Sequence, residues 1–280
     1  MFEVEATDFS LQASLTSGQS FRWQAHADFW CGVIGKAVVK VRQQEGTLSC
    51  ETSDPAMGPL EVRRYFALDL DLGAILQSID VDIQIHQAIL SHRGLRVMRQ
   101  DPWETLASFI CASFNNIKRI EGMIGRLCQS YGEALSFNGF SSFSFPHPER
   151  LAGISERRLR DLGLGYRACY LRHTAKRVAD RKLPLDQLQR VDYETVRSAL
   201  LGCEGVGDKV ADCVALFGFE KYEAFPIDVW MERAMRYYFR HRKIGSRQLH
   251  AYARRHFGSF AGYAQQYLYH DVRMRRGRDA

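Results

Sequence analysis

The chain has 280 residues, which is enough for one large domain or two ordinary domains with a sizeable core. Hydrophobic residues make up 46% of the chain and charged residues 25%, and this balance excludes an intrinsically disordered protein. The formal net charge is +6 and the pI is about 9.0, which favours a polyanionic partner but also fits a basic protein that has none.

Seven cysteines are spread along the chain, and no two of them form a C-x-x-C pair. We therefore expect neither a zinc site nor a cysteine-ligated iron–sulfur cluster, and no other metal or cofactor. An odd number of scattered cysteines is typical of a reducing compartment. Residues 1–5 (MFEVE) lack the basic and apolar regions of a secretion signal, and no run of about 18 apolar residues predicts a membrane span.

Residues 1 to about 80 have mainly the pattern of β-strands. Residues 21–24 (FRWQ) alternate apolar with polar side chains, residues 29–34 are aromatic and branched, and residues 37–42 alternate again. The turn candidates between and after these runs are residues 35–36 and 45–46. The pattern predicts an antiparallel meander.

From about residue 82 the hydrophobic period becomes helical. Residues 101–104 (DPWE) form a capping box with proline at the first helical position, and an isoleucine and leucine stripe over residues 117–127 predicts a helix that ends at Gly132. Residues 137–148, rich in Phe, Ser, Pro and His, are expected to form a loop. Further helices are predicted over residues 166–178, 192–201, 227–240 and 259–275. The fold class is therefore α+β, with a β-sheet domain over residues 1–80 and a helical domain over residues 81–280.

Residues 200–213 (LGCEGVGDKVADC) combine a glycine-rich turn with the start of a helix. The turn contains Gly205 and Gly207, and apolar residues then recur at i, i+3, i+4 and i+7 from Val210. This pattern predicts a helix–hairpin–helix motif at about residues 193–217. The free amides and the helix dipole at such a turn favour a bound phosphate.

Lys209 lies in the first turn of the second helix of this motif, and Asp228 follows later in the chain. A lysine is a nucleophile only as the neutral amine, so its pKa must fall from about 10.4. The helix N-terminus and burial would lower the pKa of Lys209, whereas Asp228 would raise it. The alternatives are a lysine that only pairs with a phosphate and an aspartate that only caps a helix starting at Val229.

A neutral amine beside a carboxylate, next to a phosphate-binding turn, suits attack at the anomeric carbon of a nucleic-acid sugar. The carboxylate can take protons or stabilise a cationic sugar-like transition state. Such an attack would release a base and leave a Schiff base on Lys209.

Four further segments extend this pattern along nearly the whole chain. They are residues 17–23 (SGQSFRW), 115–120 (NNIKRI), 162–167 (LGLGYR) and 262–265 (GYAQ). Together with the hairpin, its lysine and the aspartate after a proline, they resemble the 8-oxoguanine DNA glycosylase/AP lyase family of the helix–hairpin–helix glycosylase superfamily. The resemblance implies a twisted antiparallel N-terminal sheet, a helical bundle and an active cleft between them.

The resemblance also implies roles for individual residues. Lys209 would be the nucleophile and Asp228 the catalytic carboxylate. The backbone carbonyl of Gly18 would accept the N7–H of 8-oxoguanine, which guanine lacks, and repulsion of a lone pair could supply several kcal/mol of discrimination. Gln265 would read the Watson–Crick edge, and Tyr269, one helical turn later, would stack on the extruded base.

Cys213 would provide a soft stacking surface on the other side of that base. Each of these residues also has a simpler interpretation that the sequence leaves open. Gly18 fits an ordinary turn, Gln265 a solvated helix position, Tyr269 a core aromatic residue and Cys213 a buried structural cysteine.

Two positions differ from the usual family pattern. The family commonly has three asparagines before the residue matching Ile117, and the first fills the space left by the flipped base. Here Phe114 precedes Asn115 and Asn116, and a phenyl ring can wedge into a base stack but cannot read a base edge. The second difference is Trp230, where the family usually has histidine, and it could alter phosphate contacts at the pocket mouth.

Arginines and glycines complete the predicted DNA contacts. Arg119 and Arg167 match arginines that contact the cytosine opposite the lesion, although each could instead be a surface charge. Gly205 and Gly207 of the hairpin would contact the phosphate backbone. The basic segments at residues 236–243 and 273–278 could neutralise flanking phosphates or could simply form a solvated face.

We therefore expect a bifunctional DNA glycosylase/AP lyase that extrudes 8-oxoguanine from duplex DNA, excises it through a Lys209 Schiff base and cleaves the strand by β-elimination. The alternatives are a glycosylase for other damaged purines and a non-catalytic DNA-binding module that uses the hairpin as a phosphate clamp. The expected partner is double-stranded DNA containing 8-oxoguanine, and the expected state is a monomer without membrane attachment. The expected location is the cytoplasm of a prokaryote or otherwise the nucleus.

Overall fold

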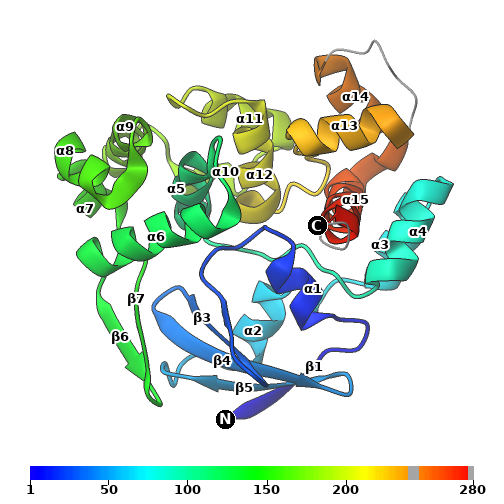
Figure 1. Cartoon of the computed structure of the whole chain (residues 1–280), viewed down its shortest axis with the longest axis horizontal. Coiled ribbons are helices and arrows are strands. Elements are labelled where there is room, and N and C mark those ends of the chain that lie inside the picture. Colours follow the sequence, from blue (N-terminus) through cyan, green and yellow to red (C-terminus); the bar gives the residue numbers. More distant parts are fainter. Residues whose placement is uncertain (239–245, 277–280) are drawn as a thin grey trace.

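A computed structural model describes the backbone of residues 1–238 and 246–276, and the side chains of residues 1–236 and 248–275. The strands near the N-terminus form one antiparallel sheet, and helices make up most of the remaining chain (Figure 1). This arrangement confirms the α+β fold class. No helix in these ranges is long and apolar enough to cross a membrane.

The sheet has five strands in the order β1-β5-β4-β3-β2. The strands are β1 (Phe2–Glu5), β2 (Gln24–Ala25), β3 (Trp30–Ile34), β4 (Ala37–Gln44) and β5 (Thr47–Thr52). The predicted runs at 29–34 and 37–42 are confirmed as β3 and β4, with turns at both expected positions. The register pairs Val39 with Gly32 and Val41 with Cys50, and both valines are buried.

The strand predicted over residues 21–24 is wrong except at its last residue. Arg22 forms an ion pair with Glu104 at 2.8 Å, and the Trp23 ring lies against Gly32. The alternation of apolar and polar residues in this segment therefore reflects side chains anchored on different neighbours, not strand pairing.

Three short helices within the first 80 residues are absent from the sequence expectations. They are α1 (Leu11–Thr16), α2 (Pro59–Tyr65) and α3 (Leu72–Ile79). Ser10 and Asp71 cap α1 and α3 by accepting backbone hydrogen bonds from the third residue of each helix. α3 packs against the C-terminal helix, α15 (Ala261–Arg276). The predicted domain boundary at residue 80 stays a prediction.

The loop predicted over residues 137–148 is wrong in its first half, because a β-hairpin occupies it. β6 (Ala134–Phe137) pairs with β7 (Phe140–Phe143) through an Asn138-Gly139 turn, and both turn residues have positive φ, at 47° and 80°. Phe137 and Phe140 pack on the small cluster of Cys31, Val33 and Val38 in the large sheet.

Helices follow in chain order after the sheet. They are α4 (Ile83–His92), α5 (Pro102–Ala112), α6 (Ile117–Tyr131), α7 (Pro148–Ala152), α8 (Glu156–Leu159), the π-helical turn η1 (Arg160–Leu164), α9 (Arg167–Ala179), α10 (Leu185–Leu188), α11 (Tyr193–Leu201), α12 (Asp208–Phe219), α13 (Val229–Tyr238), α14 (Ser246–Phe257), the 3-10 turn η2 (Gly258–Phe260) and α15. The cap predicted at Asp101 is confirmed, since its side chain accepts a backbone hydrogen bond from the third residue of α5, and Asp192 caps α11 in the same way. The sequence did not predict α14, and residues 239 and 240 of the helix predicted over 227–240 lie outside the described part.

α12 is the helix that the functional region depends on, and it lies within the core between α5 and α11. Every residue from Val210 to Phe219 is buried. The rings of Phe109 on α5 and Phe217 on α12 stack with centroids 5.6 Å apart. Tyr193 Oη on α11 donates a hydrogen bond of 2.7 Å to the buried Asp212 carboxylate. These contacts fix the position of the N-terminus of α12.

Candidate active site

Lys209 is the second residue of α12, which confirms its predicted place in the first turn. Gly207 is the N-cap residue, and the helix begins at Asp208. The Nζ atom of Lys209 lies 4.8 Å from the centroid of the buried Phe109 ring, a cation–π contact. The amine is therefore held inside the protein at the N-terminal end of a rigid helix.

A small cavity brings together the two predicted catalytic residues and the four predicted base-contacting residues. Its lining residues are Gly18, Phe109, Lys209, Cys213, Phe217, Pro226, Asp228, Gln265, Gln266 and Tyr269. The volume is about 30 Å³, enough for about two water molecules. A two-ring base needs several times this space, so the cavity must widen before it can hold one.

The protonation of Lys209 follows from its neighbours. Burial has the largest single effect and lowers the pKa of Lys209, but Cys213, Asp228 and Tyr269 raise it, and the pKa lies above its usual value. The expectation of a lowered pKa is therefore wrong for this state. Burial raises the pKa of the Cys213 thiol to about 11, so this thiol is neutral near pH 7 and the Asp228 carboxylate is the anion that favours the ammonium.

Asp228 caps a helix, and it also lies where its predicted catalytic role requires it to lie. Its Oδ1 atom accepts a 2.7 Å hydrogen bond from the Met231 backbone N–H, which caps the first turn of α13. The same side chain lines the small cavity with Lys209. The cap fixes the carboxylate in place, and a catalytic carboxylate would need such a fixed position.

Gly18 is a position where only glycine fits well. Its φ is +81°, and a Cβ atom there would lie 3.2 Å from Arg273 Nη1 and 3.5 Å from Tyr269 Cε1. The close approach to α15 places the Gly18 backbone at the cavity wall.

The other three candidates for contact with the base, Gln265, Tyr269 and Cys213, also line the small cavity. Gln265 is only 4% exposed, so its interpretation as a solvated helix residue is wrong. Its Oε1 accepts a 2.8 Å hydrogen bond from Gln266 Nε2. Tyr269 lies one turn further along α15, and burial raises the pKa of its phenol, which stays protonated. Cys213 is buried and also lines the cavity, so its structural interpretation and its predicted role are compatible.

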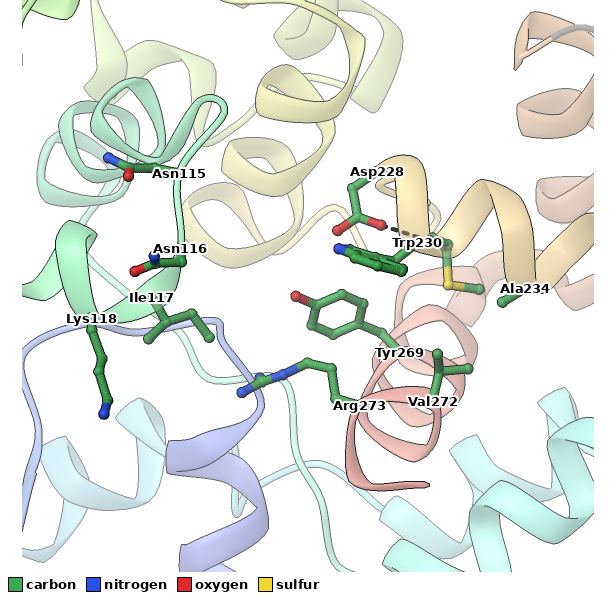
Figure 2. Close-up of a pocket in the computed structure, with 11 residues that line it drawn as sticks. Asn115, Asn116, Ile117, Lys118, Asp228, Trp230, Ala234, Tyr269, Val272 and Arg273 are labelled. Atoms are coloured by element: carbon green, nitrogen blue, oxygen red, sulfur yellow. Dashed lines mark hydrogen bonds between the residues drawn. The ribbon is translucent and has the colours of Figure 1, made fainter. Parts of the chain in front are cut away.

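A larger cleft of about 540 Å³ adjoins the small cavity, and Asp228 and Tyr269 line both spaces. Figure 2 shows side chains from α6, α13 and α15 around it. Its lining residues are Asn115, Asn116, Ile117, Lys118, Asp228, Trp230, Met231, Ala234, Tyr269, Val272 and Arg273. Trp230 is 43% exposed, and the Arg233 guanidinium lies 5.0 Å from its ring centroid. A ligand could thus pass from the cleft to Lys209 between Asp228 and Tyr269.

Phe114 and Arg167 are not at the cleft wall. Phe114 is 97% exposed and has a φ of +50°, a conformation that is strained for a bulky residue. Arg167 is 8% exposed, and its Nε donates a 2.9 Å hydrogen bond to the Ser113 carbonyl while its Nη2 donates one of 3.4 Å to the Phe114 carbonyl. The guanidinium therefore braces the Phe114 backbone, whereas Arg119 is exposed.

The remaining predicted DNA contacts lie at the ends of helices. Asn116 caps α6 by accepting a 3.0 Å hydrogen bond from the Arg119 backbone N–H, and Asn115 lies beside it on the cleft. Gly205 has a φ of +77°, and Gly207 has open space beside it. Of the two basic segments, the side chains of residues 237–243 and 276–278 lie outside the described residues.

The sequence analysis did not name Tyr166 as a possible DNA contact. Its side chain is 50% exposed, next to the arginine that braces the Phe114 backbone. The Arg167 guanidinium lies 4.4 Å from its ring centroid. The signal available was an aromatic residue directly after two turn glycines, Gly163 and Gly165, both of which have positive φ.

Comparisons with known proteins cover nearly the whole chain. Residues 1–106 match the family "8-oxoguanine DNA glycosylase, N-terminal domain", and residues 107–259 match "HhH-GPD superfamily base excision DNA repair protein". A probable N-glycosylase/DNA lyase of Methanothermobacter thermautotrophicus is 32% identical over 96% of this chain and 95% of its own. The N-glycosylase/DNA lyase of Saccharomyces cerevisiae is 35% identical over 82% of this chain and 68% of its own.

A solved structure gives the same relationship in three dimensions. The Clostridium acetobutylicum 8-oxoguanine glycosylase/lyase, in complex with double-stranded DNA containing cytosine opposite 8-oxoguanine, superposes with a TM-score of 0.92. The two sequences are 28% identical, and the match covers 99% of each chain.

The Gly18→Ala substitution should destabilise the protein more than Gly35→Ala. Both glycines have positive φ, but a Cβ at Gly35 meets nothing within 4 Å, whereas one at Gly18 meets Arg273 and Tyr269. We expect the backbone strain to cost about 1–2 kcal/mol in both variants and the contact to add to it only at Gly18. Urea unfolding measures the two losses, and equal losses would show that the close approach at Gly18 has no energetic consequence.

Proposed function

Because this chain belongs to the 8-oxoguanine DNA glycosylase family within the HhH-GPD superfamily of base excision repair proteins, we propose that it excises 8-oxoguanine from duplex DNA and then cleaves the strand. One observation carries the assignment of residues: Lys209, Asp228, Gly18 and Gln265 line a single cavity. A phosphate clamp without catalytic activity needs none of these four residues in that place.

The glycosylase step uses Lys209 as nucleophile. DNA must first extrude the damaged nucleotide, at a cost of a few kcal/mol, because C1′ is inaccessible in a stacked duplex. The neutral amine attacks C1′, the bond from C1′ to the base breaks, and the base leaves with the bonding electrons and takes up a proton. Asp228 stabilises the positive charge that develops on the sugar and accepts the proton lost by the amine.

The lyase step follows from the covalent product. Opening of the sugar ring leaves an imine between Lys209 Nζ and C1′, and this electron sink acidifies the proton at C2′. Loss of that proton breaks the C3′–O bond and releases the 3′ phosphate, which nicks the strand. Water then hydrolyses the imine and returns the free lysine.

Recognition of the lesion rests on the other residues of the small cavity. The Gly18 carbonyl accepts the N7–H of 8-oxoguanine and repels the N7 lone pair of guanine. Gln265 offers a donor and an acceptor to the Watson–Crick edge. Tyr269 and Cys213 hold the two faces of the base. Both are partly or fully buried, so the base would be held away from water.

The DNA backbone is held around the cleft. Gly205 and Gly207 present hairpin amides to a phosphate, and Asn115 and Asn116 contact the strand at the start of α6. Trp230, at the cleft mouth, contacts the sugar–phosphate chain beside the extruded nucleotide. The indole replaces the imidazole that the family usually has, so a larger aromatic surface makes this contact and the indole N–H is its one hydrogen-bond donor.

We further propose that Phe114 acts as a wedge. Its ring is fully exposed at a tight turn, and Arg167 holds the two carbonyls on either side of its Cα. An exposed ring on a braced backbone can fill the space left by the flipped base. Since Arg167 is engaged with the backbone and phenyl cannot read an edge, recognition of the opposite cytosine depends mainly on Arg119. Preference for cytosine is therefore weaker than an asparagine at position 114 would give.

The proposal also covers the partner, the oligomeric state, the cofactor requirement, the location and the domain division. The partner is double-stranded DNA containing 8-oxoguanine, the protein acts as a monomer, and the reaction needs no cofactor. Because genomic DNA is inside the cell, the proposed location of the protein is the cytoplasm of a prokaryote or the nucleus of a eukaryote. The division into a sheet domain over residues 1–80 and a helical domain over residues 81–280 is part of the same proposal.

Lys209→Gln should abolish the covalent complex that borohydride traps between the enzyme and 8-oxoguanine duplex. Glutamine has no nucleophilic amine, so no imine forms for borohydride to reduce. Lys118→Gln removes another amine from the cleft and should still be trapped. Denaturing gel electrophoresis measures both, and a cross-link that persists in Lys209→Gln would remove the proposed mechanism.

Phe114→Ala should lower kcat/KM for 8-oxoguanine excision by roughly 5- to 150-fold, since base–aromatic stacking contributes about 1–3 kcal/mol. Leu60→Ala, which truncates another exposed apolar side chain, should leave kcat/KM unchanged. Phe114→Asn should raise the ratio of excision opposite cytosine to excision opposite adenine. Single-turnover cleavage of the two duplexes measures this ratio, and an unchanged ratio would contradict the proposed effect on opposite-base preference.

A further inference from the structure

A side-chain cluster lies beside the hairpin, away from the small cavity. Cys169 and His173 are four residues apart on α9, so they lie on the same face of that helix. Glu204 belongs to the turn between α11 and α12. Among the residues that the structure describes, these three form the group of Cys, His and carboxylate donors whose ligand atoms all lie within 4.8 Å of one another.

The arrangement of the backbone keeps Glu204 over α9. A Cβ on the neighbouring Gly205 would lie 2.3 Å from the Tyr170 ring, so the hairpin approaches α9 as closely as glycine allows. One turn along, Arg177 Nη1 lies 3.6 Å from Cys203 Sγ. The hairpin and α9 are thus held together on both sides of His173.

The cluster is not explained by the contact that two of its members make. His173 Nδ1 lies 2.8 Å from Glu204 Oε2, but the two side chains are 45% and 62% exposed, and an exposed ion pair of this kind contributes little to stability. The pair also leaves the Cys169 thiol without a function. Glu204 places a carboxylate oxygen within reach of both this thiol and the His173 imidazole.

We propose that Cys169, His173 and Glu204 bind a divalent transition metal ion of the zinc type, with water as fourth ligand. One sulfur, one imidazole nitrogen and one carboxylate oxygen are ligands that Zn²⁺ accepts in a tetrahedral site. Bonds of about 2.0–2.3 Å from zinc place tetrahedral ligands roughly 3.3–3.7 Å apart. The most widely separated donors therefore need to close by only about 1 Å, and the His173–Glu204 pair, at 2.8 Å, needs to open by about 0.5 Å, which changes of side-chain rotamer supply.

Binding exchanges one set of contacts for another. The thiol releases its proton to solvent, a sulfur–metal bond forms, and the hydrogen bond between His173 and Glu204 gives way to a metal bond from each. The metal then joins α9 to the hairpin and cancels the negative charge of Glu204 next to Gly205. The unfolded chain does not hold the three ligands together, so binding should raise the thermal unfolding midpoint.

Titration of the full-length protein with Co²⁺ tests the site directly, because a thiolate ligand gives cobalt an intense sulfur-to-metal absorption. We expect one equivalent of Co²⁺ to produce this absorption in the wild type and Cys169→Ser to lose it. His173→Gln and Glu204→Gln should weaken Zn²⁺ binding, measured by competition, at least about tenfold, since even a lost outer-shell partner costs 10–100-fold. His147→Gln, which removes another exposed imidazole, should bind as the wild type does.

The proposal is wrong if the wild type shows no sulfur-to-metal absorption, if Cys169→Ser keeps it, or if the His173 and Glu204 variants bind Zn²⁺ as tightly as the wild type. All three positions are at the protein surface, so the variants should fold. Lys209→Gln should bind the metal normally, so a failure of the proposed glycosylase mechanism and a failure of this site are separate results.

Discussion

The interaction on which the functional region depends is the electrostatic attraction between the Lys209 amine and the Asp228 carboxylate, which line the same small cavity at the starts of two helices. Lys209 is fixed because α12 is buried from Val210 to Phe219. Asp228 is fixed because it caps α13 through the Met231 N–H. Neither group is placed by a flexible loop, and the two helix N-termini bring a cation and an anion to the same small cavity.

In the DNA-free state the carboxylate keeps the amine protonated, and the Phe109 ring supports the same charge. In the proposed mechanism the resting amine is therefore unreactive, and it becomes a nucleophile only when it loses its proton.

The sizes of the two spaces describe how a nucleotide reaches this pair. The outer cleft has about 540 Å³ and the inner cavity only about 30 Å³, and they meet at Asp228 and Tyr269. An extruded nucleotide can rest in the cleft, but its base must displace side chains to reach Lys209. Such a base brings apolar surface next to the amine and excludes water, and both changes favour the neutral form. In the proposed mechanism, entry of the base therefore also activates the nucleophile, and undamaged DNA that never fills the inner cavity is not attacked.

Some of these features can be predicted from the sequence and others cannot. α12, its glycine turn and Lys209 follow from local patterns, because helix period and turn chemistry act over a few residues. Gln265 could be assigned only by resemblance, and the approach of Asp228 to Lys209 could only be assumed, since both positions depend on how α13 and α15 pack. The engagement of Arg167 with the carbonyls of Ser113 and Phe114 could not be predicted, because a matching arginine can turn either to DNA or to its own backbone. C-x-x-C spacing could not indicate the cluster of Cys169, His173 and Glu204, because the cluster has one cysteine and its third member comes from a distant turn. The direction of the pKa shift of Lys209 could not be predicted either, because the groups that raise this pKa come from three separate elements.

The most direct measurement of the central claim is the pH dependence of borohydride trapping on abasic-site DNA, compared between the wild type and Asp228→Asn. Abasic DNA removes base recognition from the rate, and asparagine still caps a helix, so α13 should keep its start. Since the folded-state pKa of Lys209 is raised, the trapping rate of the wild type should increase as the pH rises above neutrality. Removal of the carboxylate removes the anion that stabilises the ammonium, so the profile of Asp228→Asn should move to lower pH. A profile that stays in place, or moves to higher pH, would show that Asp228 does not control the charge of Lys209.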